Sequence, residues 1–148
     1  MDGQFPATAL WEVKRIECRS RGSLISLYDR GRMGIQITHA PISRSALKDI
    51  AAGQFGDFVK AVVDVERGIM AIGGDMQADE EAVLLDNGST QMNLWGINLY
   101  PDLSEDQWVE FDSMINVRPA QGNRSRDVEN PDTRAKILAI VGKLVEKQ

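Results

Sequence analysis

The chain has little of the chemistry that marks metal centres, disulfide frameworks and nucleophilic active sites. Its 148 residues include a single cysteine, Cys18, and a single histidine, His39. One cysteine allows no internal disulfide, and one histidine is too few for an ordinary zinc site. No apolar run reaches the length of a membrane span, and no signal-peptide core is present. We therefore expect a cytoplasmic protein that has no membrane partner.

Positive charge is also scarce, and it is unevenly spread. Residues 1–32 hold six Lys/Arg against four Asp/Glu, a net charge of +2, which leaves 11 against 18, or −7, for the remainder. Nucleic-acid binding depends on Lys and Arg side chains that neutralise phosphates. The acidic main part of the chain therefore makes a nucleic-acid partner unexpected.

The pattern of apolar residues changes near Met33. Residues 1–32 show no sustained period of 2 or 3.6, and Met33-Gly34 then opens a regular pattern. We predict a poorly ordered N-terminal extension over residues 1–32 and a single domain over 33–148. A short strand near residues 11–18 or 23–28 is the alternative for the first segment.

The regular part predicts strands between two helices. Ser43 is a suitable N-cap for a helix over residues 44–54, and Asn130-Pro131 begins a second helix near the C-terminus. Asp79–Leu85 fits either a helix start or a strand, and Asn87-Gly88 after it favours a strand at 81–86. The other predicted strands are 58–65 and 69–72, joined as a hairpin, then 94–100 and 108–118. The fold class is then α+β, with a mostly antiparallel sheet and the N-terminal and C-terminal helices packed on one face.

Alternation along these strands gathers polar side chains on the opposite face of the sheet. Residues two apart on a strand point the same way. One hypothesis is that Asp64, Glu110 and Asp112 hold a divalent cation in a hydrolase of phosphoester-type bonds, with Arg118 and Arg124 stabilising negative charge. The alternative is an ordinary hydrated face. The full predicted set is Lys60, Asp64, Asn98, Tyr100, Glu110, Asp112, Asn116 and Arg118.

The loop after the last predicted strand is rich in guanidinium and amide groups, and it precedes the C-terminal helix. Arginine forks beside a helix N-terminus suit a carboxylate or phosphate ligand. Structural salt bridges are the competing interpretation. The candidate ligand-binding residues are Asn116, Arg118, Gln121, Asn123, Arg124 and Arg126.

A third polar cluster follows the strand at 69–72. Gly73-Gly74 permits close approach of a backbone to a ligand, and the acids just after it, Asp75, Asp79, Glu80 and Glu81, could bind a metal ion. The spacing fits neither an EF-hand loop nor a phosphate-binding loop. A turn with charged neighbours is the simpler interpretation.

Three stretches, Phe55–Asp64, Leu94–Pro101 and Ile115–Ser125, resemble an uncharacterised bacterial family, a domain of unknown function. The resemblance spans roughly residues 35–145 and implies no catalytic residues. It implies a histidine where this chain has Gln77, which removes a plausible metal ligand or proton carrier. From the residues we expect a binding or interaction module for a small anionic ligand or a protein partner, with the metal-assisted hydrolase as the alternative.

Overall fold

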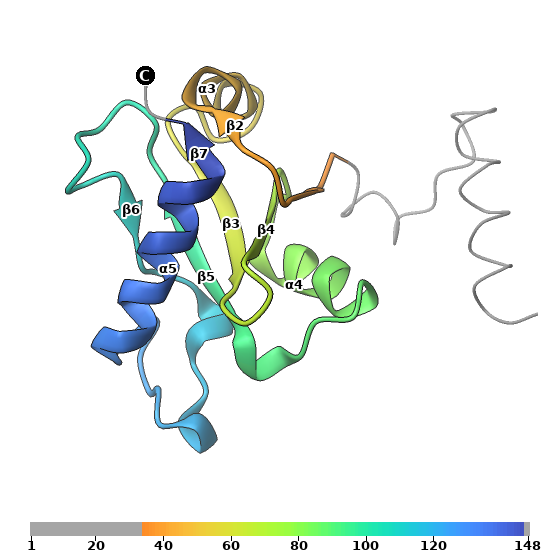
Figure 1. The fold of residues 1–148 in the computed structure, drawn as a ribbon, viewed down its shortest axis with the longest axis vertical. Coiled ribbons are helices and arrows are strands. Elements are labelled where there is room, and N and C mark those ends of the chain that lie inside the picture. The colour runs from red at the N-terminus through yellow and green to blue at the C-terminus, as the bar shows by residue number, and fades with distance from the viewer. Residues whose placement is uncertain (1–33, 147–148) are drawn as a thin grey trace, which may run out of the picture. The chain divides into compact units, whose positions relative to one another are not determined.

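A five-stranded antiparallel sheet forms the centre of the computed structural model, which describes residues 34–146 (Figure 1). The predicted extension over residues 1–32, including Cys18, lies outside the described residues. The strand order is β1–β4–β3–β5–β6, and every neighbouring pair is antiparallel. A second, two-stranded sheet pairs β2 (Ile42–Ser43) in parallel with β7 (Val145–Glu146). The five strands are β1 (Gln36–Thr38), β3 (Val59–Asp64), β4 (Ile69–Ile72), β5 (Leu94–Leu99) and β6 (Val109–Glu110).

Two helices begin at the capping residues that the sequence predicts. The Oγ of Ser43 accepts a hydrogen bond from the backbone N–H of Ala46 and starts α3 (Arg44–Ala52). Asn130 accepts from the backbone N–H groups of Asp132 and Thr133 and starts α5 (Pro131–Leu144). A side-chain acceptor at the N-cap satisfies N–H groups that have no partner inside the helix. Both helix predictions are confirmed.

Alternate residues of the sheet enter two separate hydrophobic clusters. Val59, Ala61 and Val63 of β3 share the larger cluster with Trp95, Ile97 and Leu99 of β5 and with apolar residues of α3 and α5. Figure 1 shows α5 lying across the sheet. Val62, between two members of the larger cluster, points the other way and joins Ala71 and Leu84 in the smaller one. The predicted alternation of β3 is therefore confirmed.

The prediction of a strand at residues 81–86 is wrong, because this segment belongs to a helix, α4 (Gln77–Asp86). Asp79 and Glu80 lie in its first turn, where the helix dipole favours acids. Gly88, with a φ of +102°, follows the helix end, and Ser89 N–H donates to the carbonyl of Leu84. Asn87-Gly88 therefore ends a helix. The buried Leu84 brings α4 against the sheet face that the sequence left open.

The prediction of one long strand at 108–118 is also wrong. Strand β6 ends at Glu110, and residues Met114–Asn116 form a 3-10 helix whose N-cap is Ser113. Val109 and Phe111 pack against the larger cluster as expected, but Ile115 packs against the smaller one. The Asn116 side chain takes the place of a strand beside β5, accepting from Gly96 N–H at 2.8 Å and donating to Gly96 O at 3.0 Å.

These elements make an α+β domain with a mostly antiparallel sheet, as predicted. Neither α3, α4 nor α5, nor any shorter helix within residues 34–146, combines the length and apolar character needed to cross a bilayer. The long polar face predicted for the sheet is shortened, because α4 covers one part of it and the chain leaves the sheet after Glu110.

Candidate functional site

Strand register places three polar residues in one row on the sheet face that α4 partly covers. Lys60 of β3 lies opposite Asn98 of β5, and Asn98 lies opposite Glu110 of β6. Directly opposed residues of antiparallel strands have their side chains on the same face. This row is the part of the predicted polar face that the structure brings together, and we call it the polar row.

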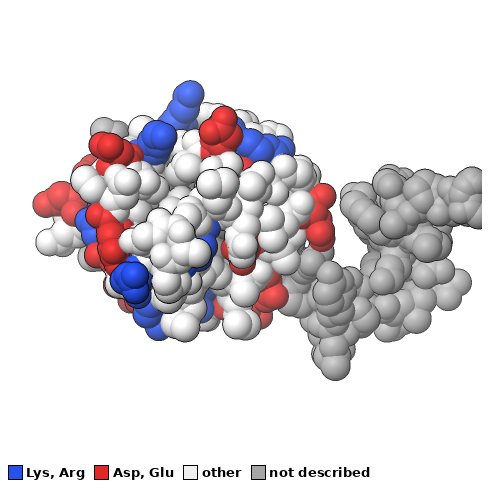
Figure 2. Space-filling model, turned by 90° about the horizontal axis from the view of Figure 1, so that it is seen from below, with Lys and Arg blue, Asp and Glu red and all other residues white. Residues whose placement is uncertain are grey.

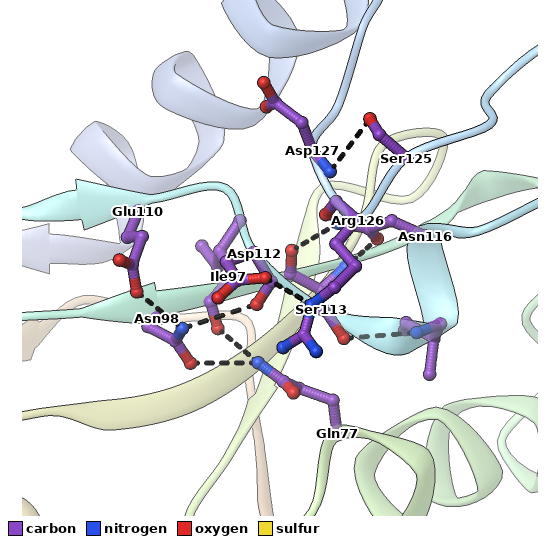
Figure 3. Close-up of polar contacts among 12 residues, drawn as sticks. Gln77, Ile97, Asn98, Glu110, Asp112, Ser113, Asn116, Ser125, Arg126 and Asp127 are labelled. Atoms are coloured by element: carbon purple, nitrogen blue, oxygen red, sulfur yellow. Dashed lines mark hydrogen bonds and ion pairs between the residues drawn. The ribbon is translucent and has the colours of Figure 1, made fainter.

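Helix α4 contributes Gln77 to the polar row at the point where the helix begins (Figure 3). The buried Gln77 donates from Nε2 to Asn98 Oδ1 and to the carbonyl of Ile97, both at 3.0 Å. Asn98 in turn donates from Nδ2 to Glu110 Oε1 at 2.8 Å and to the carbonyl of Asp112 at 3.3 Å. These bonds connect α4, β5 and β6, so the amides of Gln77 and Asn98 are fixed in orientation.

Tyr100 extends this network at its outer end. Its hydroxyl donates to Glu110 Oε1 at 3.2 Å. Partial burial, followed by the charge and hydrogen bond of Glu110, raises the pKa of Tyr100, which keeps the hydroxyl a donor. The Tyr100 ring also stacks on Phe58, with ring centroids 5.2 Å apart, and Phe58 stacks on Phe55 at 4.8 Å.

Lys60 is the cation of the polar row, and it is only half-buried. Its Nζ lies 4.9 Å from the centroid of the Phe55 ring. None of the ion pairs formed among residues 34–146 involves Lys60. An ammonium group in an apolar and amide-rich setting, without a carboxylate in contact, can accept an anion without first losing a protein partner.

Glu80 lies behind the polar row, one turn into α4, and its side chain is fully buried. Its Oε2 accepts from Gly74 N–H at 2.9 Å, whereas Oε1 is buried and forms no hydrogen bond with any group of residues 34–146. Burial raises the pKa of Glu80 well above its usual value, against the smaller lowering effects of the Gly74 N–H and of Lys60. Burial favours the neutral form of a carboxyl group, so Glu80 retains a proton to a higher pH than an exposed glutamate.

The glycine pair before α4 is explained by protein contacts. A Cβ at Gly73 would lie 2.4 Å from the carbonyl oxygen of Gly34, and one at Gly74 would lie 2.9 Å from Glu80 Cγ. The close approach that these glycines permit is therefore to Gly34 and Glu80. Their neighbour Asp75 accepts a hydrogen bond from Gln54 at 3.3 Å.

The loop that the sequence singled out is held together mainly by its own polar side chains. Asn123 is buried and donates from Nδ2 to the carbonyls of Asn116, Ser125 and Asp127. Asn116 is occupied by Gly96 and by the carbonyl of Arg126. These two predicted ligand-binding residues are thus engaged within the protein.

Among the remaining predicted loop residues, three have side chains that bond to other protein groups, and the fourth is Arg124. Arg118 donates to the carbonyls of Gln91 and Leu94, and Gln121 donates to the carbonyl of Met92 at 2.8 Å. Arg126 binds Asp112 through Nε at 2.6 Å. Arg124 is exposed, and its backbone N–H donates to Glu129. Five of the six predicted residues, all but Arg124, thus have side chains bonded to other protein groups.

The three carboxylates of the metal hypothesis do not come together either. Asp64 is fully buried at the far end of β3, where it accepts from the N–H groups of Glu66 and Arg67 and from Ser89 Oγ. Glu110 belongs to the polar row, and Asp112 is paired with Arg126. Within residues 34–146, no group of three or more His, Cys, Asp or Glu side chains has a metal-binding arrangement.

Residues 36–144 match a family described as Protein of unknown function (DUF5674). The chain belongs to this family. No curated protein and no solved structure matches it. The matched range agrees with the resemblance seen in the sequence, and it runs from β1 to the end of α5.

The sets of candidate ligand residues did not include Gln77 and Glu80, although the sequence marked Gln77 through the family resemblance and Glu80 through the charged segment after Gly73-Gly74. Both belong to α4, and the strand predicted at 81–86 separated them from the sheet face that they contact. Asp79 and Glu80 at the start of an apolar segment were the available signal, because acids favour the first turn of a helix.

Proposed function

We propose that this protein is a binding domain for a small anionic ligand, held between Lys60 and the first turn of α4. The observation that carries the proposal is the half-buried Lys60, which contacts the Phe55 ring but enters none of the ion pairs formed within residues 34–146. Of the two targets that the sequence left open, a small anion or a protein partner, this cation favours the anion.

The first turn of α4 supplies a second reason. Its N-cap residue, Met76, makes no side-chain hydrogen bond to the helix, and Met76 is 56% exposed. The first N–H groups of a helix lack intrahelical partners and carry partial positive charge, so they attract anions. Gln77 in this turn is bonded to Asn98, which lies opposite Lys60. The helix start and the ammonium group therefore belong to one region.

Most carboxylates around the proposed site are paired, hydrogen-bonded or buried, whereas Asp79 in the first turn of α4 opposes an anion. Asp112 is paired with Arg126, and its carboxylate charge is thereby balanced. Burial raises the pKa of Glu80, the buried acid of this turn, so its carboxyl group becomes charged only at a higher pH than that of an exposed glutamate. Glu110 is the remaining carboxylate of the polar row, and it accepts hydrogen bonds from Asn98 and Tyr100.

Nucleic acid is not the proposed partner of this protein. On the face drawn in Figure 2, Lys and Arg side chains are interspersed with Asp and Glu and do not form one basic patch. A phosphate backbone requires many such cations on one surface.

We propose a cytoplasmic location, because a single cysteine is typical of proteins from a reducing compartment.

The test is titration of the full chain with sodium sulfate and with sodium succinate, followed by ¹H–¹⁵N NMR spectra. We expect both anions to shift the amide resonances of Gln77 and Ala78. Replacement Lys60→Met keeps most of the side-chain length and removes the charge, and we expect it to weaken binding at least tenfold. Lys136→Met is the matched control, because Lys136 is exposed on α5.

Two results would contradict the proposal. Equal anion affinity in the wild type and Lys60→Met would remove Lys60 from the site. Resonance shifts confined to residues 118–126 would move the anion to the loop that the sequence first indicated.

A further inference from the structure

Glu80 is the buried group that the proposed anion site does not itself use. Its side chain extends from α4 beneath Gly74, where Oε2 accepts the Gly74 N–H and Oε1 finds no hydrogen-bond donor. Ile35 closes the same space, since a Cβ on Gly74 would lie 3.1 Å from Ile35 Cδ1 and 2.9 Å from Glu80 Cγ. A carboxylate here would carry one bonded oxygen and one oxygen surrounded by protein without a donor.

The charges around Glu80 are few. Lys60 of β3 is the cation that acts on it, and Asp79, its neighbour in α4, acts in the opposite sense. Asp75 lies in the preceding loop and is bonded to Gln54. Ile35, which closes this space, packs against the smaller apolar cluster together with Ile37 of β1, and Ala71 of β4 is a member of that cluster. The Gly74 N–H is the main group that favours the charged form of Glu80, and Lys60 adds a smaller favourable effect of its positive charge.

We propose that Glu80 takes up a proton when an anion binds at Lys60, so that ligand binding and protonation are coupled. This inference rests on the proposed function. The anion neutralises the field of Lys60 and adds its own repulsion, and both effects penalise a carboxylate at Glu80. The proton comes from solvent and goes to the Glu80 carboxyl group, with Oε1 as the oxygen that has no other partner.

The coupling has a defined pH dependence. Anion binding raises the pKa of Glu80 further, so the complex holds more proton than the free protein between the two pKa values. Anion affinity then falls as pH rises through this interval, at most about tenfold per pH unit for one coupled proton. By the same reciprocity, lowering the pH strengthens anion binding.

The experiment is calorimetric titration of the full chain with sodium sulfate between pH 5 and pH 8. Sulfate keeps its charge in this range, so it contributes no proton of its own. Each titration is repeated in two buffers that differ in heat of ionisation, which gives the number of protons taken up. The variants are Glu80→Gln, which mimics the neutral acid, and Glu81→Gln, which makes the same change one residue later in α4.

In the wild type we expect uptake of up to one proton per sulfate and an affinity that falls with rising pH. In Glu80→Gln we expect no uptake and an affinity that stays near the low-pH value of the wild type. Glu81→Gln should behave as the wild type. Uptake that persists in Glu80→Gln would assign the proton to another group and overturn the inference.

The inference and the proposed function fail in different ways. Lys60-dependent sulfate binding without proton uptake would overturn the role of Glu80 and leave the anion site standing. Absence of sulfate binding, or binding that Lys60→Met does not weaken, would overturn both. Thermal unfolding of each variant shows whether the fold is retained.

Discussion

The guanidinium of Arg118 lies over the ring of Trp95, with Cζ 4.2 Å from the ring centroid. Its Nη1 donates to the carbonyl of Gln91 at 2.5 Å, and its Nη2 donates to the carbonyl of Leu94. Arg118 therefore holds the start of β5 against the loop after the 3-10 helix Met114–Asn116. The sequence offered Arg118 as an anion ligand, but both of its Nη groups donate to backbone carbonyls.

We expect Arg118→Ala to lower the free energy of unfolding by about 1–3 kcal/mol, because it removes a cation–π contact and the guanidinium hydrogen bonds to two backbone carbonyls. Arg124→Ala should change stability by less than about 0.5 kcal/mol, because Arg124 is exposed. Urea denaturation of both variants measures the difference. Equal stability of the two variants would show that Arg118 is not needed for the fold and is available to bind an anion.

Gly96→Ala should destabilise the protein, because the new Cβ would lie 2.5 Å from both Cβ and Oγ of Ser113. Overpacking of this kind costs about 1–3 kcal/mol. Gly142→Ala is the control, since it lies in α5 with no atom near the new Cβ, and it should stabilise by about 0.5–1 kcal/mol. A Gly96→Ala protein as stable as the wild type would show that the packing of Ser113 on β5 is adjustable.

Met76→Asp should have opposite effects on stability and on anion binding. An aspartate at the N-cap of α4 supplies the acceptor that Met76 lacks and should stabilise the protein by about 1 kcal/mol. It also occupies the N–H groups and repels anions, so sulfate affinity should fall several-fold. Met92→Asp, at another exposed methionine, is the control. Unchanged sulfate affinity in Met76→Asp would exclude the α4 terminus from the anion site.

Glu80→Gln should change how stability depends on pH. The folded protein has a raised Glu80 pKa, so between the unfolded value of about 4.3 and the folded value it binds more protons than the unfolded chain. Protonated Glu80 therefore contributes to the free energy of unfolding. This contribution is complete below the pKa of Glu80 in the unfolded chain, and it is lost as pH rises through the pKa in the folded protein. The loss is about 1.4 kcal/mol for each pH unit by which folding raises the pKa. Urea denaturation at several pH values should show this loss in the wild type and in Glu81→Gln, but not in Glu80→Gln. If the free energy of unfolding varied with pH in the same way in all three proteins, the raised pKa of Glu80 would be contradicted.

Much of the fold could be predicted because its signals are local. Ser43 and Asn130 are efficient caps, and both start helices. The alternation of β3 separates Val63 from Val62, and the two residues enter different clusters as predicted. The two failures, at 81–86 and 108–118, are segments whose pattern fits more than one structure. Asn87-Gly88 ends hairpin strands and helices alike, and packing against the sheet selected the helix.

The candidate site was predicted only in part, for a related reason. The strand pattern correctly placed Lys60, Asn98 and Glu110 on one face. It could not show that Asn116, Arg118 and Asn123 satisfy carbonyl and N–H groups that lie up to 27 residues away in the chain. A polar side chain looks the same in sequence whether it binds a ligand or a distant backbone group.

The sequence by itself determined the acidic balance of this protein, its two capped helices, its central hairpin and the two-sided character of β3. These features depend on neighbouring residues, on backbone preferences and on the period of the side chains. Tertiary structure alone decided that α4 packs on the second face of the sheet, that Glu80 is buried and that Lys60 has no carboxylate in contact with it within residues 34–146. Burial and pairing depend on which distant segments meet, and that is set by the packing of the whole domain.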